Sequence, residues 1–336
     1  MPKTVVRCLP LTPALLLLLA TSSAGAKDTK AYTDPMNADT DFSVQGEYTG
    51  TVKGKEGDKK LGVQVIALGD GRFRAVGYAA GLPGDGWEGG EKEAVEASLA
   101  DGVVTFAGKH ATGVIKDGEM RVTNKEGTPI GDLKRVLRTS PTLGEKPPAG
   151  AVVLFDGSSA DHWVNTRGGP AKMTEDGLLM HGANSKQKFA SHKLHIEFQL
   201  PYQPHARGQG RGNSGLYLQG RYEVQMLDSF GLDGLDNECG GIYSVSRPRI
   251  NMCYPPLSWQ TYDVDFTAAQ YDADGKKTRH ARITVRHNGV LIHEDAELPK
   301  RTQGGPTAEG PEPGVVHLQD HGNPVRYRNI WVVENE

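Results

Sequence analysis

The sequence predicts an all-β protein in which a small antiparallel β domain precedes a larger two-sheet sandwich or jelly roll. Glycine and proline are abundant, with 43 and 20 among 336 residues, which is typical of a chain rich in turns. Short apolar runs recur between turn signals, and no amphipathic segment reaches helix length. Since the chain exceeds the usual size of a single core, two domains are expected.

The first 26 residues have the features of a secretory signal. Two basic residues precede the apolar run Leu15–Leu19, and Ala24-Gly25-Ala26 fits a small-residue cleavage site. We expect export to the periplasm or the extracellular space after cleavage near Ala26, and no membrane span, because no apolar run is long enough. Residues 27–42 are polar and lack periodicity, so they are predicted to be a tether.

Residues 43–140 are predicted to form the small β domain, as an open sheet or a barrel. Turn signals such as Asp101-Gly102 and Asp117-Gly118 separate its strands. The expected strands are 48–52, 61–68, 73–78, 94–99, 103–107, 111–115, 119–122 and 133–137. The glycine-rich loop 81–87 lies between the expected strands 73–78 and 94–99. We expect Trp87 to pack at the base of this loop, and the alternative is that it stacks on a sugar ring or partner. The sequence indicates no role for this domain.

A proline-rich linker at 141–149 leads to the sandwich, residues 150–336. Asn288-Gly289 between two apolar runs is a strong hairpin signal. Besides a first run at 152–155 and a central pair, the expected strands are 178–181, 193–200, 260–268, 279–287, 290–293, 315–319 and 325–333.

The central pair lies within Gly212–Ser229, where strands 214–219 and 222–227 are predicted to meet in a tight turn at Gly220-Arg221. Because side chains alternate along a strand, Glu223 and Gln225 share one face and Val224 and Met226 the other. Tyr217 and Gln219 are candidates for the polar face. This face is too polar for a core, and we interpret it as the floor of a cleft.

Two further strands alternate in the same way. His195, Glu197 and Gln199 share one face, and His317, Gln319 and His321 share another. Joined to the Glu223 face in one concave sheet, they would form a groove of carboxylates, amides and imidazoles, which suits carbohydrate chemistry. The alternative is a sheet face that meets water, and each of His195, Glu197 and His317 alone is more typical of such a surface.

Charge and cysteine content restrict the function classes. A formal net charge of −3 and a pI near 6.4 argue against nucleic-acid binding. Cys8 leaves with the signal, so Cys239 and Cys253 remain, and in an exported chain they are predicted to form a disulfide. A thiol nucleophile or a metal site is the alternative, although no neighbouring histidine pattern supports either.

Four segments carry a family resemblance: 212–229, 236–243 (DNECGGIY), 255–265 (PPLSWQTYDVD) and 318–331 (LQDHGNPVRYRNIW). Over about residues 150–334 the chain resembles the bacterial exported family called the 3-keto-disaccharide hydrolase domain. The resemblance implies a concanavalin-like β-sandwich, as in laminarinase-type glucanases, and cleavage of 3-keto-glycosides. A separate sugar 3-dehydrogenase would supply the 3-keto sugar.

The resemblance also guides the choice of site residues. Related glucanases carry two carboxylates on one strand face, but Gln225 stands where the second acid is expected, so we predict C2 proton abstraction and elimination instead of double displacement. Glu223 or a histidine would be the base, and Gln225, Gln319 or Arg249 would hold the oxyanion. The expected catalytic residues are Glu223, Gln225, His181 and His321. The expected substrate-binding residues are Glu197, Tyr217, Gln219, Arg249, Gln319 and Trp259.

No cofactor is expected to be required. A divalent metal held by Glu197, His195, Asp228 and His321 is the alternative, without a close-spaced ligand motif to support it. The glycine-rich run 208–212 precedes a strand instead of opening a helix, so it does not predict dinucleotide binding. A non-catalytic, lectin-like carbohydrate-binding module is the competing function, and an envelope adhesion unit is a further one.

Overall fold

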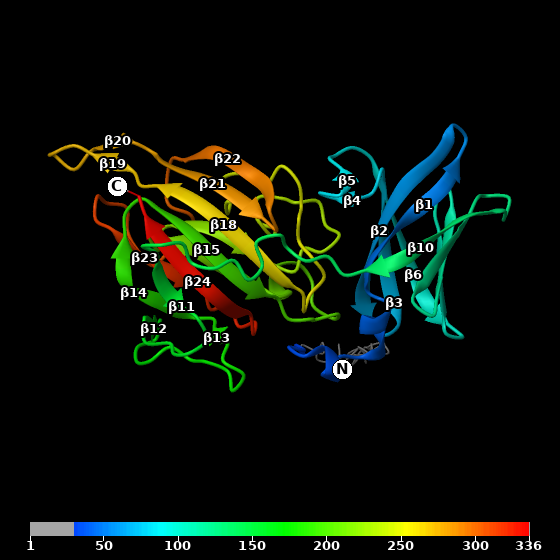
Figure 1. The fold of residues 1–336 in the computed structure, drawn as a ribbon, viewed down its shortest axis with the longest axis horizontal. Helices are drawn as coiled ribbons and strands as arrows, with labels where there is room; N and C mark the ends of the chain where they lie inside the picture. Colours follow the sequence, from blue (N-terminus) through cyan, green and yellow to red (C-terminus); the bar gives the residue numbers. More distant parts are fainter. Residues whose placement is uncertain (1–29, 336) are drawn as a thin grey trace, which may run out of the picture.

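The computed structural model describes residues 30–335 as two β domains that lie side by side (Figure 1). The predicted signal at 1–26 and the start of the tether lie outside the described residues. The prediction of an all-β protein is confirmed, since the helical segments are three short 3-10 turns: η1 (Pro35–Asn37), η2 (Thr40–Ser43) and η3 (Gly208–Gly210). No helix among residues 30–335 has the length and hydropathy needed to cross a bilayer.

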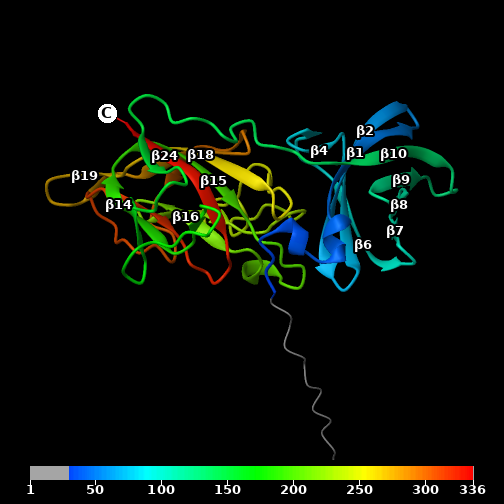
Figure 2. The ribbon, with the colours of Figure 1, turned by 60° about the horizontal axis from the view of Figure 1, so that its bottom comes forward.

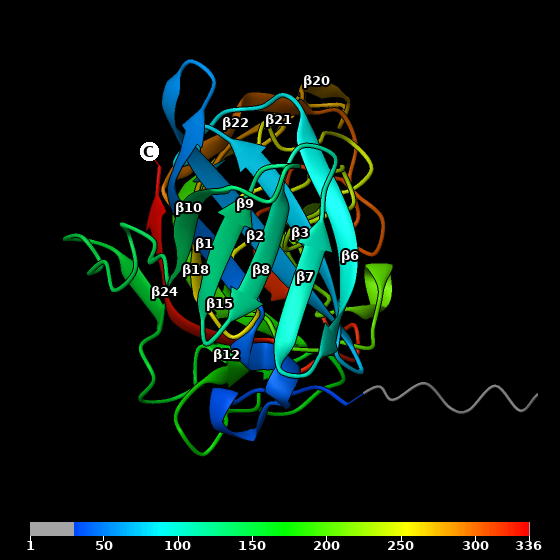
Figure 3. The ribbon, with the colours of Figure 1, turned by 90° about the vertical axis from the view of Figure 1, so that its right-hand side faces the viewer.

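The first domain is a closed antiparallel barrel, seen from its outer side in Figure 3. The sequence was compatible with an open sheet or a barrel, and the structure shows the barrel. The eight predicted strands are all present, and the order around the barrel is β1-β10-β9-β8-β7-β6-β3-β2. The strands are β1 (Gly46–Gly54), β2 (Gly57–Gly69), β3 (Arg72–Ala79), β6 (Lys92–Ala100), β7 (Val103–Ala107), β8 (Thr112–Lys116), β9 (Glu119–Thr123) and β10 (Pro129–Val136).

Apolar side chains fill the barrel, so its interior is a packed core. Tyr48, Val65, Phe73 and Leu133 are fully buried in it. Two very short strands, β4 (Leu82–Pro83) and β5 (Gly86–Trp87), lie in the loop between β3 and β6.

The second domain is a sandwich of two sheets. The larger sheet has the order β11-β24-β15-β18-β21-β22, with β13 beside β24. Its strands are β11 (Val152–Phe155), β13 (Leu179–Met180), β15 (His192–Gln199), β18 (Trp259–Thr267), β21 (Ala281–His287), β22 (Val290–Leu298) and β24 (Arg326–Glu334). A separate ribbon, β19 (Gln270–Tyr271) and β20 (Lys277–Arg279), extends from one end (Figure 1).

The smaller sheet has five strands in the order β12-β14-β23-β16-β17. These are β12 (Trp163–Asn165), β14 (Ala183–Phe189), β23 (Gly314–Leu318), β16 (Ser214–Leu218) and β17 (Tyr222–Met226). The apolar faces of the two sheets meet in one core, where Ile196 and Phe198 of the larger sheet lie in the same cluster as Val224 and Met226 of the smaller. The predicted sandwich is therefore present, and strand parity assigned these core residues correctly.

The barrel packs against loops of the sandwich through the outer face of β2 and β3. Ile66, Val76 and Tyr78 belong to the same buried cluster as the sandwich core. A Cβ on Gly231 would come within 2.4 Å of Ile66, so the two surfaces are in close contact. The barrel thus supports the loop that follows β17.

Two connecting segments also bind the sandwich. The predicted tether is ordered from Lys30 onward: Tyr32 pairs with Tyr202 through two backbone hydrogen bonds of 2.9 Å, and Asp39 accepts a hydrogen bond from the Tyr202 hydroxyl. The linker after β10 runs from the barrel along the larger sheet (Figure 2), where Gly144 and Glu145 bond side chains of β15 and β24.

Candidate functional site

The hairpin of β16 and β17 carries the candidate site on its outer face. Its turn needs two residues with positive φ, Gln219 at 54° and Gly220 at 63°, the geometry of a type I′ turn that matches strand twist. Val224 and Met226 face the core, while Glu223 faces outward with Tyr217 opposite it. Gln219 lies in the turn, where its side chain bonds Phe189 O and Arg221. It therefore does not join the candidate site.

A row of four polar residues crosses the sheet in register. Asn184 of β14 pairs with His317 of β23, His317 with Tyr217 of β16, and Tyr217 with Glu223 of β17. The Tyr217 hydroxyl donates a hydrogen bond of 2.7 Å to Oε2 of Glu223. The ring centroids of Tyr217 and His317 lie 5.1 Å apart in an edge-on contact. Direct contacts thus link the imidazole, the phenol and the carboxyl group.

Glu223 is held in its neutral form. Its residue is 2% exposed, and burial raises the pKa of the carboxyl group to about 8, with the hydrogen bond from Tyr217 opposing part of that effect. At neutral pH, Glu223 is a proton donor.

His317 shows the opposite shift. Burial lowers the pKa of its imidazole to about 4. Its Nδ1 lies 2.7 Å from Oδ1 of Asn184, an oxygen that only accepts, so Nδ1 carries the hydrogen and Nε2 keeps its lone pair. At neutral pH, His317 is a base with a fixed tautomer.

Amide side chains form a second row beside the first. Gly215 pairs with Gln225, and the backbone N–H of Gln319 donates to Gly215 O. A Cβ at Gly215 would lie 2.2 Å from Oε1 of Glu223, so only glycine leaves room for the carboxyl group. Gln225 donates its amide to Gln209 at 3.2 Å, and Gln319 donates to the Tyr217 hydroxyl at 3.1 Å.

The amide oxygens of this row lack partners. Oδ1 of Asn213, Oε1 of Gln225 and Oε1 of Gln319 are buried without a hydrogen bond among the described residues. A buried acceptor without a partner costs about 1–3 kcal/mol.

The site is more enclosed than the open cleft that we predicted. Thr302 accepts a hydrogen bond from the backbone of Glu223, Gln303 O lies 3.0 Å from the Tyr217 hydroxyl, and Gly304 packs against that hydroxyl. The segment between β22 and β23 therefore covers the row. The predicted grouping of Glu223, Gln225, Tyr217 and Gln319 is present, but beneath a loop.

The two histidines expected to be catalytic are not part of the row: His181 lies between β13 and β14, and His321 follows β23. His181 contacts Asp320, with Nδ1 3.1 Å from the carboxylate, and burial lowers the pKa of its imidazole despite that anion. His321 follows Asp320 in an exposed turn. The histidine that shares the face of Glu223 is His317.

The prediction that β15 contributes to the same groove is wrong. His195, Glu197 and Trp259 lie in the larger sheet, whereas Glu223 and His317 lie in the smaller one. Both apolar faces are turned to the shared core, so the polar faces point away from each other. Nor are His195, Glu197 and His317 solvated, since their exposed fractions are 0%, 1% and 6%.

The linker covers the polar face of β15. Glu197 accepts hydrogen bonds from Gly144 N at 2.5 Å, Arg328 at 2.7 Å and Asn329 at 2.9 Å. Trp259, expected to bind substrate, instead stacks on the Arg328 guanidinium, 4.0 Å from the ring centroid. These residues attach the linker to the sandwich.

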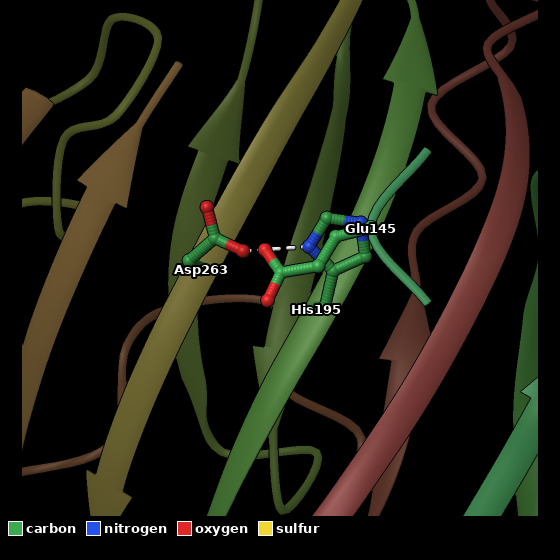
Figure 4. A group of neighbouring side chains, drawn as sticks. All are labelled: Glu145, His195 and Asp263. Carbon is green, nitrogen blue, oxygen red and sulfur yellow. Dashed lines mark hydrogen bonds and ion pairs between the residues drawn. The ribbon is translucent and has the colours of Figure 1, made fainter. Parts of the chain in front are cut away.

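The four predicted metal donors are not gathered. Asp228 forms an ion pair of 2.5 Å with Arg211, and His321 follows β23 of the smaller sheet, whereas His195 and Glu197 lie on β15 of the larger sheet. Among the described residues, one group has metal-ligand spacing: Glu145, His195 and Asp263, with ligand atoms within 4.8 Å of one another (Figure 4). His195 Nδ1 lies 2.6 Å from Asp263 and is ion-paired there, on the sheet opposite Glu223.

Arg249, a candidate for holding the oxyanion, is also elsewhere. It is exposed, pairs with Glu294 at 3.2 Å, and lies beside the barrel.

The predicted disulfide is not formed, because Cys239 and Cys253 are free, buried thiols. The two thiols contact each other through a side-chain hydrogen bond, and each has a further polar contact. Cys239 Sγ lies 3.3 Å from the Tyr262 hydroxyl, and Cys253 donates to Leu227 O at 3.5 Å. In this setting they act as small apolar side chains in the core.

Sequence reasoning missed part of the site. Asn184 lies on β14, a polar strand (ANSKQKF) without the apolar alternation that marks the others. Gln209 and Asn213 come from the loop before β16, where no periodicity indicates direction. The alternation of its strand placed His317 on a polar face. What singles it out is its pairing with Tyr217 across the sheet, which only the structure shows.

The fold is that of a β-sandwich protein, and comparisons with known proteins support a carbohydrate-active class. The family model described as "3-keto-alpha-glucoside-1,2-lyase-like domain" matches residues 150–333. The chain belongs to this family, which confirms the resemblance seen in its motifs.

Two solved structures from Parabacteroides distasonis ATCC 8503, both provisionally assigned as glycosyl hydrolases, are similar to the chain. The first is 35% identical with a TM-score of 0.52, covering 56% of this chain and 85% of its own. The second is 20% identical with a TM-score of 0.41, covering 60% of this chain and 99% of its own. Among curated proteins, no match was found.

Proposed function

We propose that the chain is an exported enzyme that cleaves the glycosidic bond of 3-keto-glycosides by acid–base elimination at Glu223 and His317. One observation carries the proposal: on the two sides of Tyr217, burial raises the pKa of a carboxyl group to about 8 and lowers that of an imidazole to about 4. Two groups with pKa values driven apart in this way are suited to act as acid and base in one reaction.

The chemistry of a 3-keto sugar fits this pair. The ketone acidifies the C2 proton, which Nε2 of His317 removes, and the electron pair of the C2–H bond moves onto the C3 oxygen as an enolate. When the enolate reverts to the ketone, that pair forms the C1–C2 double bond and the glycosidic C1–O bond breaks. Glu223 donates its proton to the departing oxygen. His317 ends protonated and Glu223 ionised, and a proton transfer through solvent restores both.

The enolate oxygen at C3 needs hydrogen-bond donors while it carries charge. The Nε2 groups of Gln225 and Gln319 have hydrogens beyond those given to Gln209 and Tyr217. We assign them this role. Addition of water to the unsaturated product then gives net hydrolysis.

Double displacement by two carboxyl groups is disfavoured by the residue beside Glu223 on the strand face. A retaining pair needs carboxyl groups about 5 Å apart, and this position holds Gln225, which cannot be a nucleophile of that kind. In this proposal Glu223 is the general acid and not the base that the sequence suggested. His317 is the base that removes the C2 proton.

The proposal includes the expected setting of the enzyme. The substrate would be produced by a separate sugar 3-dehydrogenase, and the reaction would follow export. Because Glu223 is 2% exposed, the segment Thr302–Gly304 must shift for a sugar to enter. That no cofactor is required stays a prediction.

Turnover of a 3-keto-glycoside tests the proposal. We expect the native protein to release the leaving group from 3-keto-trehalose or an aryl 3-keto-glucoside, and Glu223→Gln and His317→Asn to lose at least 100-fold in kcat. His280→Asn, at a histidine 44% exposed, is the matched control and should keep full activity. Full activity in either site variant would remove that residue from the mechanism.

A lectin-like module is the second candidate, favoured by the unpaired oxygens of Asn213, Gln225 and Gln319. These acceptors would bind sugar hydroxyls with or without catalysis. Saturable binding of the 3-keto-glycoside by the native protein, without release of product, would identify the protein as a binding module.

A further inference from the structure

A second cleft lies where the barrel meets the sandwich. It has a volume of about 370 Å³ and is lined from the barrel by Tyr78, Trp87 and Lys92, and from the loop after β17 by Asp233, Arg247 and Arg249. Ligand pockets commonly occur at domain junctions and span about 300–1,000 Å³. The cleft is large enough for a sugar residue, and it is separate from the site of Glu223.

Trp87 gives the cleft an aromatic wall. The ring packs edge-on against Tyr78, with centroids 5.0 Å apart and an angle of 69°, so a buried neighbour fixes its orientation. The residue is half-buried, and its indole N–H donates no hydrogen bond within residues 30–335. The position next to it is open, since a Cβ at Gly89 or Gly90 would meet no atom within 4 Å. An immobilised indole with a free N–H suits the C–H face of a sugar.

The charge of the cleft favours an anion. Lys92, Arg247 and Arg249 oppose a single carboxylate, Asp233, which Lys92 already pairs at 2.6 Å. Arg247 donates one N–H to Asp233 O at 3.1 Å, and Arg249 uses one on Glu294 at 3.2 Å. Each guanidinium carries five N–H donors, so both keep donors for a ligand. Guanidinium groups bind carboxylates in a planar, two-point geometry.

The walls of the cleft are held in place before any ligand binds. Lys92 of the barrel donates to Leu232 O at 3.0 Å, and both residues line the cleft. This bond joins the barrel to the loop after β17. A preformed cleft binds its ligand with a smaller entropic cost.

The loop that forms the sandwich wall also borders the candidate active site. Gly240 N donates to Gln225 O at 2.9 Å, and Tyr243 N donates to Glu223 O at 3.2 Å. The loop after β17 therefore contacts both the cleft and the backbone of β17.

We propose that this cleft binds an acidic sugar, a hexuronate residue of an oligosaccharide, with Trp87 against the ring and Arg247 and Arg249 on the carboxylate. The inference rests on the proposed function in that it takes the ligand to be a carbohydrate. It gives the barrel a role in selecting polymers that carry uronate groups.

Calorimetric titration of the Glu223→Gln protein with trigalacturonate, compared with neutral maltotriose, tests the proposal. We expect saturable binding of the acidic trisaccharide and at least tenfold weaker binding of the neutral one. Trp87→Ala and the double variant Arg247→Ala/Arg249→Ala should each lose at least tenfold in affinity. Arg282→Ala, at a residue that pairs with Asp295 on β21, is the control and should bind normally.

Equal affinity for the two trisaccharides, undiminished binding by both cleft variants, or no saturable binding would overturn the proposal. Melting temperatures verify folding, and because Arg247 and Arg249 are exposed, their double variant remains informative if Trp87→Ala unfolds. Turnover of a small 3-keto-glucoside by the native protein is measured separately. A failure of uronate binding is thereby distinguished from a failure of the proposed function.

Discussion

The Tyr217 hydroxyl donates its hydrogen to Oε2 of Glu223 over 2.7 Å, and this bond opposes the effect of burial on the carboxyl group. Burial raises the pKa of Glu223 to about 8, and the bond from Tyr217 lowers it. The phenol itself stays protonated, since burial and the neighbouring Glu223 raise the pKa of Tyr217. The strength of this bond therefore sets the pH range in which Glu223 can donate a proton.

Tyr217→Phe should extend activity to higher pH. With Glu223 as acid and His317 as base, kcat/KM should rise near pH 4 and fall near pH 8, following the two pKa values. Loss of a hydrogen bond to an ionised group raises the pKa of Glu223, and the alkaline limb should move up by about 1 pH unit. Rate profiles of the native and variant proteins measure both limbs. A change confined to the acid limb would instead assign Glu223 as the base.

Glu223→Gln should remove a pH-dependent destabilisation. The pKa of the carboxyl group is 4.5 in the unfolded chain and about 8 in the fold, so the folded state holds a proton that the unfolded state has lost. Stability should thus fall as pH rises from 4.5 through 8, by on the order of 5 kcal/mol. The glutamine variant should be about as stable as the native protein at pH 4 and more stable at pH 9.

Denaturant titration at both pH values measures this difference. Glu56→Gln, at a glutamate 84% exposed, is the control and should follow the native protein. A glutamine variant that gains no stability at pH 9 would show that the Glu223 carboxyl ionises freely in the fold.

Glu197→Gln should weaken the attachment of the linker. Burial raises the pKa of Glu197, but hydrogen bonds from His195, Asn329, Gly144 and Arg328 overcome it and lower the value to about 2. The stabilisation is complete above pH 4.5 and is lost as pH falls through 2, and it amounts to about 3 kcal/mol. The variant should be less stable at pH 7 and should lose much of its acid dependence, as thermal melting from pH 2 to 7 would show.

His195, which contacts Glu197, should contribute a loss of stability at alkaline pH. Burial lowers the pKa of His195, but the hydrogen bonds that its imidazole donates to the carboxylates of Asp263 and Glu197 raise it to about 9. The contribution of His195 is complete below pH 6.5 and is lost as pH rises through 9. In His195→Gln, the loss of stability between pH 7 and 9 should be smaller than in the native protein. An unchanged alkaline limb would contradict this cause.

Local patterns predicted the elements of the fold well where one face is apolar. The eight barrel strands and the strand parity of Glu223 and Val224 follow from alternation, because a one-residue slip would expose the core. The strand that contains Asn184 was not predicted, because residues 184–187 (NSKQ) show no apolar alternation. Pairing of Asn184 with His317 fixes the position of this strand in the sheet.

The sequence did not indicate which of the polar strands would share a sheet. His195 and His317 have similar alternation, yet tertiary pairing places them in different sheets. Burial was equally hidden: the linker covers Glu197, and the segment at Gln303 covers Tyr217. Both covers come from segments without periodicity, so the pKa values that define the candidate acid and base follow from tertiary structure alone.

Arg138 joins the two domains through a buried ion pair. Two of its nitrogens bond the Glu47 carboxylate at 2.7 and 2.5 Å, and a third donates to Pro83 O at 2.6 Å. Its guanidinium also lies 4.8 Å from the ring centroid of Tyr254 in the sandwich. Glu47 is fully buried on the outer face of the barrel, where Gln64 is its other partner.

Arg138→Ala should cost about 3–5 kcal/mol of unfolding free energy, because it leaves the Glu47 charge buried without a counterion. Arg121→Ala is the matched control: its pair with Asp132, at 3.4 Å, is 70% and 62% exposed and is worth less than about 1 kcal/mol. The double variant Arg138→Met/Glu47→Met removes both charges and should recover most of the loss. Denaturant unfolding measures the stability of all three variants. If the double variant is as unstable as Arg138→Ala, the lost contacts to Pro83 and Tyr254 cause the effect, and the uncompensated carboxylate does not.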